Sequence, residues 1–179
     1  MAEEKKEQWL NYLALTTVIF AVCATLSTFK GGGFSTKSIM SQSQASDQWA
    51  AYQSKSIKSY LYQMQAEKLE LDLASLPTAT QLQLSEKYNQ TINDYRAKVE
   101  KYNQEKEELR TMAKGFEANR DEAQIHSHAF SLAVIYLQIS ILLSSIAGLL
   151  KKKGIWLFGI LCGTLGLVFF ADGFLVFLT

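Results

Sequence analysis

Three long apolar runs constrain this 179-residue chain more than any other feature of its sequence. They cover residues 10–29, 130–150 and 155–178, and almost no charged residue interrupts them. Each holds about 20 residues, which at a helical rise of about 1.5 Å per residue matches the roughly 30 Å hydrocarbon layer of a bilayer. The sequence therefore predicts an all-α integral membrane protein with three transmembrane helices, whose first partner is the lipid bilayer.

The composition argues against two large classes of function. The net charge is +1, and lysines and arginines alternate with acidic residues instead of forming a basic face, so we expect no nucleic-acid partner. The patterns H-E-x-x-H, G-x-S-x-G, C-x-x-C and G-x-x-x-x-G-K-[ST] do not occur. We therefore expect a protein that is not an enzyme and that uses no cofactor, metal or catalytic residue.

The short loop Lys151–Gly154 predicts the orientation. It carries three lysines and no acid, and positive residues beside a span resist translocation, so this loop should face the cytoplasm. With three spans the N-terminus is then cytoplasmic too, and Trp9 and Trp156 lie at the cytoplasmic interface that indole rings prefer. In a bacterium the inner membrane would hold the chain, with the segment between the first two spans in the periplasm.

That segment carries a seven-residue repeat. One heptad position is occupied by Tyr88, Tyr95, Tyr102, Leu109 and Phe116. Ile92 and Val99 follow two of these residues by four positions, which completes the 4-3 spacing of a coiled-coil seam. The pattern predicts one long helix that continues into the second apolar run.

A second, antiparallel helix is predicted upstream. It places Ile57, Leu61, Met64 and Leu71 at near-heptad steps, with Tyr62, Leu69, Leu73 and Leu76 on a neighbouring face. Pro77, the only proline, should lie at the tip of the hairpin.

A fold-back at Pro77 predicts which residues face each other across the hairpin. The expected pairs are Tyr60 with Tyr95, Ile57 with Val99, Tyr52 with Tyr102 and Lys55 with Glu100.

These elements give the expected domain organisation. It comprises a cytoplasmic N-terminus with the first transmembrane helix (1–29), a flexible Gly/Ser exit segment (30–40), an antiparallel coiled-coil hairpin (41–128, tip at 76–80), a second transmembrane helix (129–150), a basic cytoplasmic loop (151–154) and a third transmembrane helix (155–179). Gly31, Gly32 and Gly33 are the reason for expecting flexibility at 30–40. A phosphate cradle is the alternative for that segment, although it lacks the ending of a P-loop.

One block of the hairpin resembles a known family. Residues 46–58, SDQWAAYQSKSIK, are similar to the signature block of small bacterial membrane proteins catalogued as a domain of unknown function, number 4337. The resemblance implies one span before and two spans after a helical segment, and it implies no activity. Within the block we expect Trp49, Tyr52 and Ile57 to supply packing.

Two features of the spans are candidates for function. Asp172 is the only acidic residue within an apolar run, where a carboxylate is costly. It either reaches water or Lys30 near the interface, or handles protons or ions. Gly159 and Gly163 form a G-x-x-x-G pair that lets another helix approach closely, either within the chain or in an oligomer.

Two functions fit these features. The first is a non-enzymatic, membrane-anchored scaffold that forms a homo-oligomer or holds a protein partner on the hairpin, because a bare two-helix hairpin buries little surface. The alternative is an oligomeric channel or transport subunit with Asp172 near the outer mouth of the pore. The second span has a modest set of polar residues and the third is almost wholly apolar, which favours the anchor.

Overall fold

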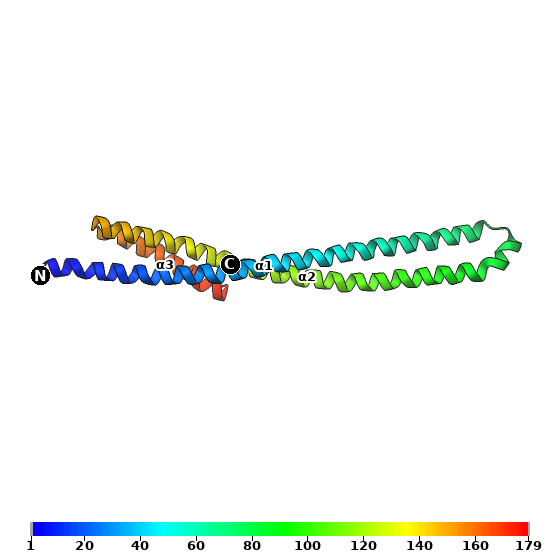
Figure 1. Cartoon of the computed structure of the whole chain (residues 1–179), viewed down its shortest axis with the longest axis horizontal. Helices are drawn as coiled ribbons and strands as arrows, with labels where there is room; N and C mark the ends of the chain where they lie inside the picture. The colour runs from blue at the N-terminus through cyan, green and yellow to red at the C-terminus, as the bar shows by residue number, and fades with distance from the viewer. Residues whose placement is uncertain (1, 179) are drawn as a thin grey trace. The chain divides into compact units, whose positions relative to one another are not determined.

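The computed structural model describes residues 2–178, with the side chains of residues 2–7, 78 and 79 left outside the description. The chain forms three helices: α1 (Ala2–Ser75), α2 (Thr78–Leu150) and α3 (Lys153–Leu175) (Figure 1). All three are long and apolar enough to be membrane-span candidates. The all-α fold and the hairpin packing of α1 against α2 are therefore confirmed.

The chain divides into two compact units. One, the apolar unit, comprises Met1–Met40 and Asn119–Thr179; the other, the hairpin unit, comprises Ser41–Ala118. The hairpin unit thus ends at Ala118 and not at residue 128. Because α2 ends at Leu150 and α3 begins at Lys153, the basic loop consists of Lys151 and Lys152.

Residues 30–40 are helical, so the expected break between the first apolar run and the hairpin is wrong. Each glycine inside a helix costs about 1 kcal/mol relative to alanine, but tertiary packing often outweighs propensity. Gly31 shows that packing, because a Cβ there would lie 3.0 Å from Phe130 Cβ. The Ser127 hydroxyl also donates a hydrogen bond to the carbonyl oxygen of Gly31 at 3.2 Å.

Two residues, Leu76 and Pro77, join α1 to α2, as the position of the proline predicted. The carbonyl oxygen of Pro77 accepts a hydrogen bond from the backbone N–H of Gln81 at 2.9 Å. The first turns of α2 cross the tip before α2 runs beside α1 (Figure 1).

The expected pairing across the hairpin is wrong by several residues, because α2 joins α1 only after crossing the tip. Lys55 pairs with Glu105 instead of Glu100, at 2.5 Å. Tyr62, not Tyr60, meets Tyr95, with ring centroids 5.4 Å apart.

The expected packing face of α1 is also wrong. Ile57, Met64 and Leu71 are 68%, 64% and 72% exposed. The face that packs, here called the inner seam of α1, follows 4-3 steps through Tyr52, Lys55, Ser59, Tyr62, Ala66, Leu69 and Leu73, all buried or half-buried. Lys55, Ser59 and Ala66 alternate in this seam with the larger side chains of Tyr52, Tyr62, Leu69 and Leu73.

The seam of α2 lies where the heptad placed it. Ile92 is buried, and Tyr88, Tyr95, Val99 and Tyr102 are half-buried. The hydroxyl of Ser59 on α1 donates to Asn103 Oδ1 at 3.0 Å beside these residues. The seam therefore faces α1 within one chain.

The core of the apolar unit joins all three helices. Its buried cluster comprises Phe20, Ala24, Ala133 and Leu137, and the half-buried residues around it include Cys23 from α1, Ile141 from α2 and Phe170 from α3. Leu137 is fully buried.

Candidate functional site

The C-terminal end of α3 packs around Phe130 of α2. Its side chain is fully buried, and its ring meets Phe174 at 5.0 Å between centroids and Phe170 at 6.2 Å. A Cβ added at Gly173 would come within 2.8 Å of the same ring. One aromatic residue of α2 therefore organises the packing at the end of α3 within this unit.

Asp172 caps the C-terminal end of α3. Its Oδ1 accepts hydrogen bonds from the backbone N–H groups of Phe177 and Leu178, both at 2.7 Å, and its own carbonyl oxygen accepts one from Val176 at 2.7 Å. Val176 is in the left-handed region with φ of 48°. A fully buried carboxylate that satisfies two backbone donors has a structural reason to be there, which neither interpretation of the sequence included.

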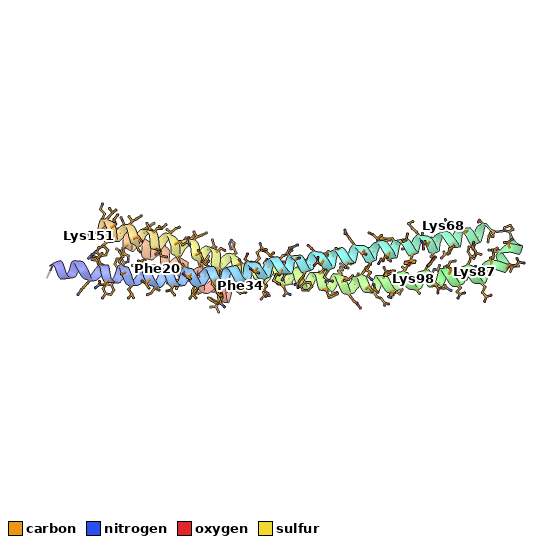
Figure 2. The ribbon with its side chains drawn as sticks, in the orientation of Figure 1. Phe20, Phe34, Lys68, Lys87, Lys98 and Lys151 are labelled. Carbon is orange, nitrogen blue, oxygen red and sulfur yellow. The ribbon has the colours of Figure 1, made fainter. Side chains whose placement is uncertain are left out.

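His126 is half-buried beside this cap. Its Nδ1 is 2.8 Å from the carbonyl oxygen of Gly173, and its ring stacks on Phe34 with centroids 4.5 Å apart. With a hydrogen on Nδ1, the imidazole donates to one of the last carbonyls of α3, which have no partner in their own helix. His126 thus connects α2 to the end of α3, while Phe34 of α1, labelled in Figure 2, covers its ring.

A hydroxyl-lined groove runs between α1 and α2 in the apolar unit. It consists of two adjoining hollows of about 410 and 440 Å³ that share Ser35, Ser127 and Ser131. Several hydroxyls already donate to backbone oxygens, among them Ser131 to the carbonyl oxygen of Ser127 at 2.8 Å. The groove therefore offers mainly acceptor lone pairs to anything that enters it.

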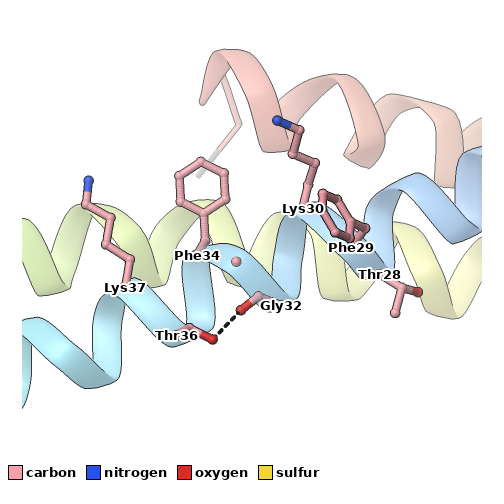
Figure 3. A pocket seen from close by; sticks show the side chains of 8 residues that line it. Thr28, Phe29, Lys30, Gly32, Phe34, Thr36 and Lys37 are labelled. Carbon is pink, nitrogen blue, oxygen red and sulfur yellow. Dashed lines mark hydrogen bonds between the residues drawn. The ribbon is translucent and has the colours of Figure 1, made fainter.

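The glycine-rich segment forms a shallow hollow on α1 itself, about 670 Å³ in volume. Figure 3 shows Lys30, Phe34 and Lys37 projecting to the same side of the helix, while Thr36 donates a hydrogen bond to the carbonyl oxygen of Gly32 at 3.0 Å. A phosphate cradle needs free backbone N–H groups in a loop, and here the segment is helical. The cradle alternative is therefore wrong.

Glycines line the face of α3 that packs on the other helices. Gly159, Gly163, Gly166 and Gly173 are all buried. A Cβ on Gly163 would overlap the ring of Phe20, and one on Gly166 would lie 2.8 Å from Leu137 Cγ. The G-x-x-x-G pair is thus used for packing inside the chain.

The other end of the apolar unit carries tryptophans and lysines together. The rings of Trp9 and Trp156 are 6.1 Å apart, and Lys153 Nζ lies 5.8 Å from the Trp9 ring centroid. Trp156 Nε1 donates to the hydroxyl of Thr16 at 3.3 Å. Amphipathic rings and cations of this kind are typical of a headgroup layer.

The hairpin unit contains its own charged and aromatic cluster. The hydrogen-bonded ion pair with Glu105 raises the pKa of Lys55, and the hydrogen bond from Lys55 lowers the pKa of the Glu105 carboxyl. Lys55 Nζ also lies 5.3 Å from the ring centroid of Tyr102. Trp49 Nε1 donates to Glu117 Oε1 at 2.9 Å, and the Trp49 ring packs edge-on against Tyr52 at 5.5 Å.

Together these contacts define a class of protein: an all-α chain with three membrane-span candidates, two of which belong to helices that also form a hairpin. The chain belongs to the family described as Domain of unknown function (DUF4337), whose model matches residues 9–176. No curated protein and no solved structure matches it. The family expected from the sequence is confirmed.

Proposed function

We propose that this protein is a non-enzymatic membrane anchor for a helical scaffold. In this proposal α3 and the apolar segments of α1 and α2 cross a bacterial inner membrane, and the hairpin unit stands in the periplasm. The observation that carries the proposal is that α1 and α2 each run without interruption through both units, so no linker separates the anchor from the hairpin. Over about 35 residues, each arm of the hairpin is on the order of 50 Å long.

The proposed orientation rests on the charged end of the apolar unit. Lys153 Nζ lies 5.8 Å from the ring centroid of Trp9, which pairs with Trp156, and Lys151 and Lys152 directly precede Lys153 in the chain. Positive residues at the end of a span favour the cytoplasmic side. The hairpin unit then belongs on the opposite side, because α1 and α2 each cross once.

A scaffold is favoured over a channel by the role of Asp172. The channel alternative depends on a carboxylate that is open to an ion path, but this carboxylate is fully buried and occupied by two backbone donors. The glycine face of α3 is likewise occupied within the chain.

Topology and flux measurements test the proposal. With Cys23 and Cys162 replaced by alanine, Ser43→Cys in the hairpin and Lys152→Cys in the loop are labelled with a membrane-impermeant maleimide. We expect Ser43→Cys to react in intact spheroplasts and Lys152→Cys to react only after permeabilisation. The reverse pattern, extraction of the protein by alkaline carbonate, or ion flux through reconstituted liposomes would each contradict it.

A further inference from the structure

The hairpin unit leaves a second apolar face of α1 uncovered. It consists of Ile57, Leu61, Met64 and Leu71, which are 49–72% exposed and are here called the outer stripe. The steps between them are those of a heptad, with Lys68 at the intermediate position. Most of the large aliphatic residues of this arm of the hairpin therefore face away from α2.

The outer stripe is separate from the inner seam. Ile57 lies two residues from Lys55 and two from Ser59, and two residues correspond to about 200° around a helix. The stripe is thus on the opposite side of α1 from the contacts with Glu105 and Asn103. Within the hairpin unit, α1 has one coiled-coil face towards α2 and another towards solvent.

We propose that the outer stripe is the interface on which a second copy of this chain packs, with its α1 parallel. The 4-3 spacing fits another helix lying along α1, since knobs at these positions enter holes of a partner with the same pitch. The proposal rests on the proposed anchor, which makes α1 leave the bilayer in the same direction in every copy. A two-fold axis then brings each stripe residue towards its own counterpart.

Charge complementarity supports the same partner. In a parallel pair, Leu61 and Lys68 take the first core position (a) of successive heptads, and Met64 and Leu71 take the second (d). Glu67 then precedes the core residue Lys68 at a flanking position. That flanking position is the one that reaches across to the partner helix, so Glu67 of each copy can meet Lys68 of the other. A single core lysine also selects one register and a low number of subunits.

The other arm of the hairpin provides no comparable face. Leu82, Leu84 and Met112 are its exposed large aliphatic residues among those the structure describes, and they form no run at heptad steps. A contact between two copies of α1 is therefore favoured over one between α1 and α2.

Disulfide cross-linking of the full-length protein in nanodiscs tests the contact. In the cysteine-free background, Met64→Cys should form a cross-linked dimer under mild oxidation, and Gln90→Cys, at an exposed position on α2, should not. Co-expressed Ile57→Cys and Leu71→Cys chains should not cross-link to each other, because these positions are far apart in a parallel pair. Cross-linking between them, or equal reaction of Gln90→Cys, would overturn the proposal.

Native mass spectrometry from mild detergent tests whether the outer stripe stabilises a dimer. The wild type should be a dimer, and Ile57→Ser combined with Met64→Ser and Leu71→Ser should shift it to monomer without loss of helical circular dichroism, because these side chains face away from α2. Lys68→Glu should weaken the dimer, since it faces Glu67 of the partner. A monomeric wild type, or a dimer that persists in the triple variant, would reject the interface. The maleimide labelling tests the proposed membrane topology separately and does not depend on this result.

Discussion

The hydroxyl of Ser140 on α2 donates a hydrogen bond to the carbonyl oxygen of Gly159 on α3 at 2.7 Å, and both residues are buried. The contact requires close backbone approach, because a Cβ on Gly159 would lie 3.4 Å from the carbonyl oxygen of Ser140. In a lipid environment packing of small residues and interhelical hydrogen bonds replace the hydrophobic effect as the source of helix association. Glycine and serine thus let α2 and α3 approach each other closely at this point.

The first prediction concerns this glycine face. Gly166→Ala should destabilise the apolar unit by about 1–3 kcal/mol, since its Cβ would meet Leu137 Cγ at 2.8 Å and the Leu137 backbone nitrogen at 3.0 Å. The measurement is thermal unfolding in detergent, followed by a thiol-reactive dye on the half-buried Cys23 and Cys162.

The matched control is Gly154→Ala, where an added Cβ meets nothing within 4 Å. Alanine is the better helix former by about 0.5–1 kcal/mol, so this variant should unfold at the same temperature or higher. If both substitutions change the midpoint equally, close packing at α3 is not what holds the unit together.

The second prediction separates the two faces of α1 in the hairpin unit. Tyr62→Ala should destabilise the hairpin by about 2 kcal/mol, because its half-buried ring contacts Tyr95, stacks on Tyr102 at 5.9 Å and lies 4.8 Å from Lys98 Nζ. Tyr60→Ala, at a site 64% exposed, should cost less than about 1 kcal/mol. Hydrogen exchange of the hairpin peptides measures both, and a larger effect at Tyr60 would favour the register expected from a fold-back at Pro77.

Much of the fold could be predicted from the sequence because apolar runs and heptads are strong, local signals. The span candidates and the seam through Tyr95 and Tyr102 follow from them, and the tip follows from Pro77, the only proline. The inner seam of α1 could not be found in this way, since Ser59 and Ala66 carry no hydrophobic signal and Ile57 carries a misleading one. Aliphatic residues at heptad steps predict a helix contact without saying which helix makes it.

The candidate site was predictable only in part, because its contacts join residues far apart in the chain. Asp172 stood out as a charge in an apolar run, but its cap depends on Val176 turning into the left-handed region, which nothing before it in the sequence requires. His126 and Phe34 meet only once the packing of α1 against α2 is known. Gly31 predicted a break because propensity is local and its packing against Phe130 is not.

The third prediction is a pH dependence of hairpin stability set by Lys55 and Glu105. The lowered pKa of Glu105 adds stability that is present above its ordinary value of 4.5 and is lost as the pH falls through the lower, folded-state pKa. The raised pKa of Lys55 adds stability that is present below 10.5 and is lost as the pH rises through the higher, folded-state pKa.

Glu105→Gln tests this dependence against Glu108→Gln, which removes an exposed carboxyl on the same helix. Thermal melts of helical circular dichroism on the acidic side of neutrality should lose part of their pH dependence in Glu105→Gln and keep it in Glu108→Gln. If the melting temperatures of both variants fall equally as the pH is lowered, carboxyl groups other than Glu105 determine the acid dependence of hairpin stability.

The last prediction separates a structural role of Asp172 from a role in handling ions. Asp172→Asn keeps an oxygen that can accept from the N–H groups of Phe177 and Leu178, so its effect on stability should be small. Asp172→Leu removes the acceptor and leaves two backbone donors unsatisfied, at a cost of about 1–3 kcal/mol each. In the thiol-dye unfolding assay and in hydrogen exchange of the C-terminal peptide, the wild type should therefore be the most stable, Asp172→Asn slightly less stable and Asp172→Leu the least stable. If Asp172→Asn is as destabilising as Asp172→Leu, the negative charge itself is needed, and Asp172 is again a candidate for handling ions.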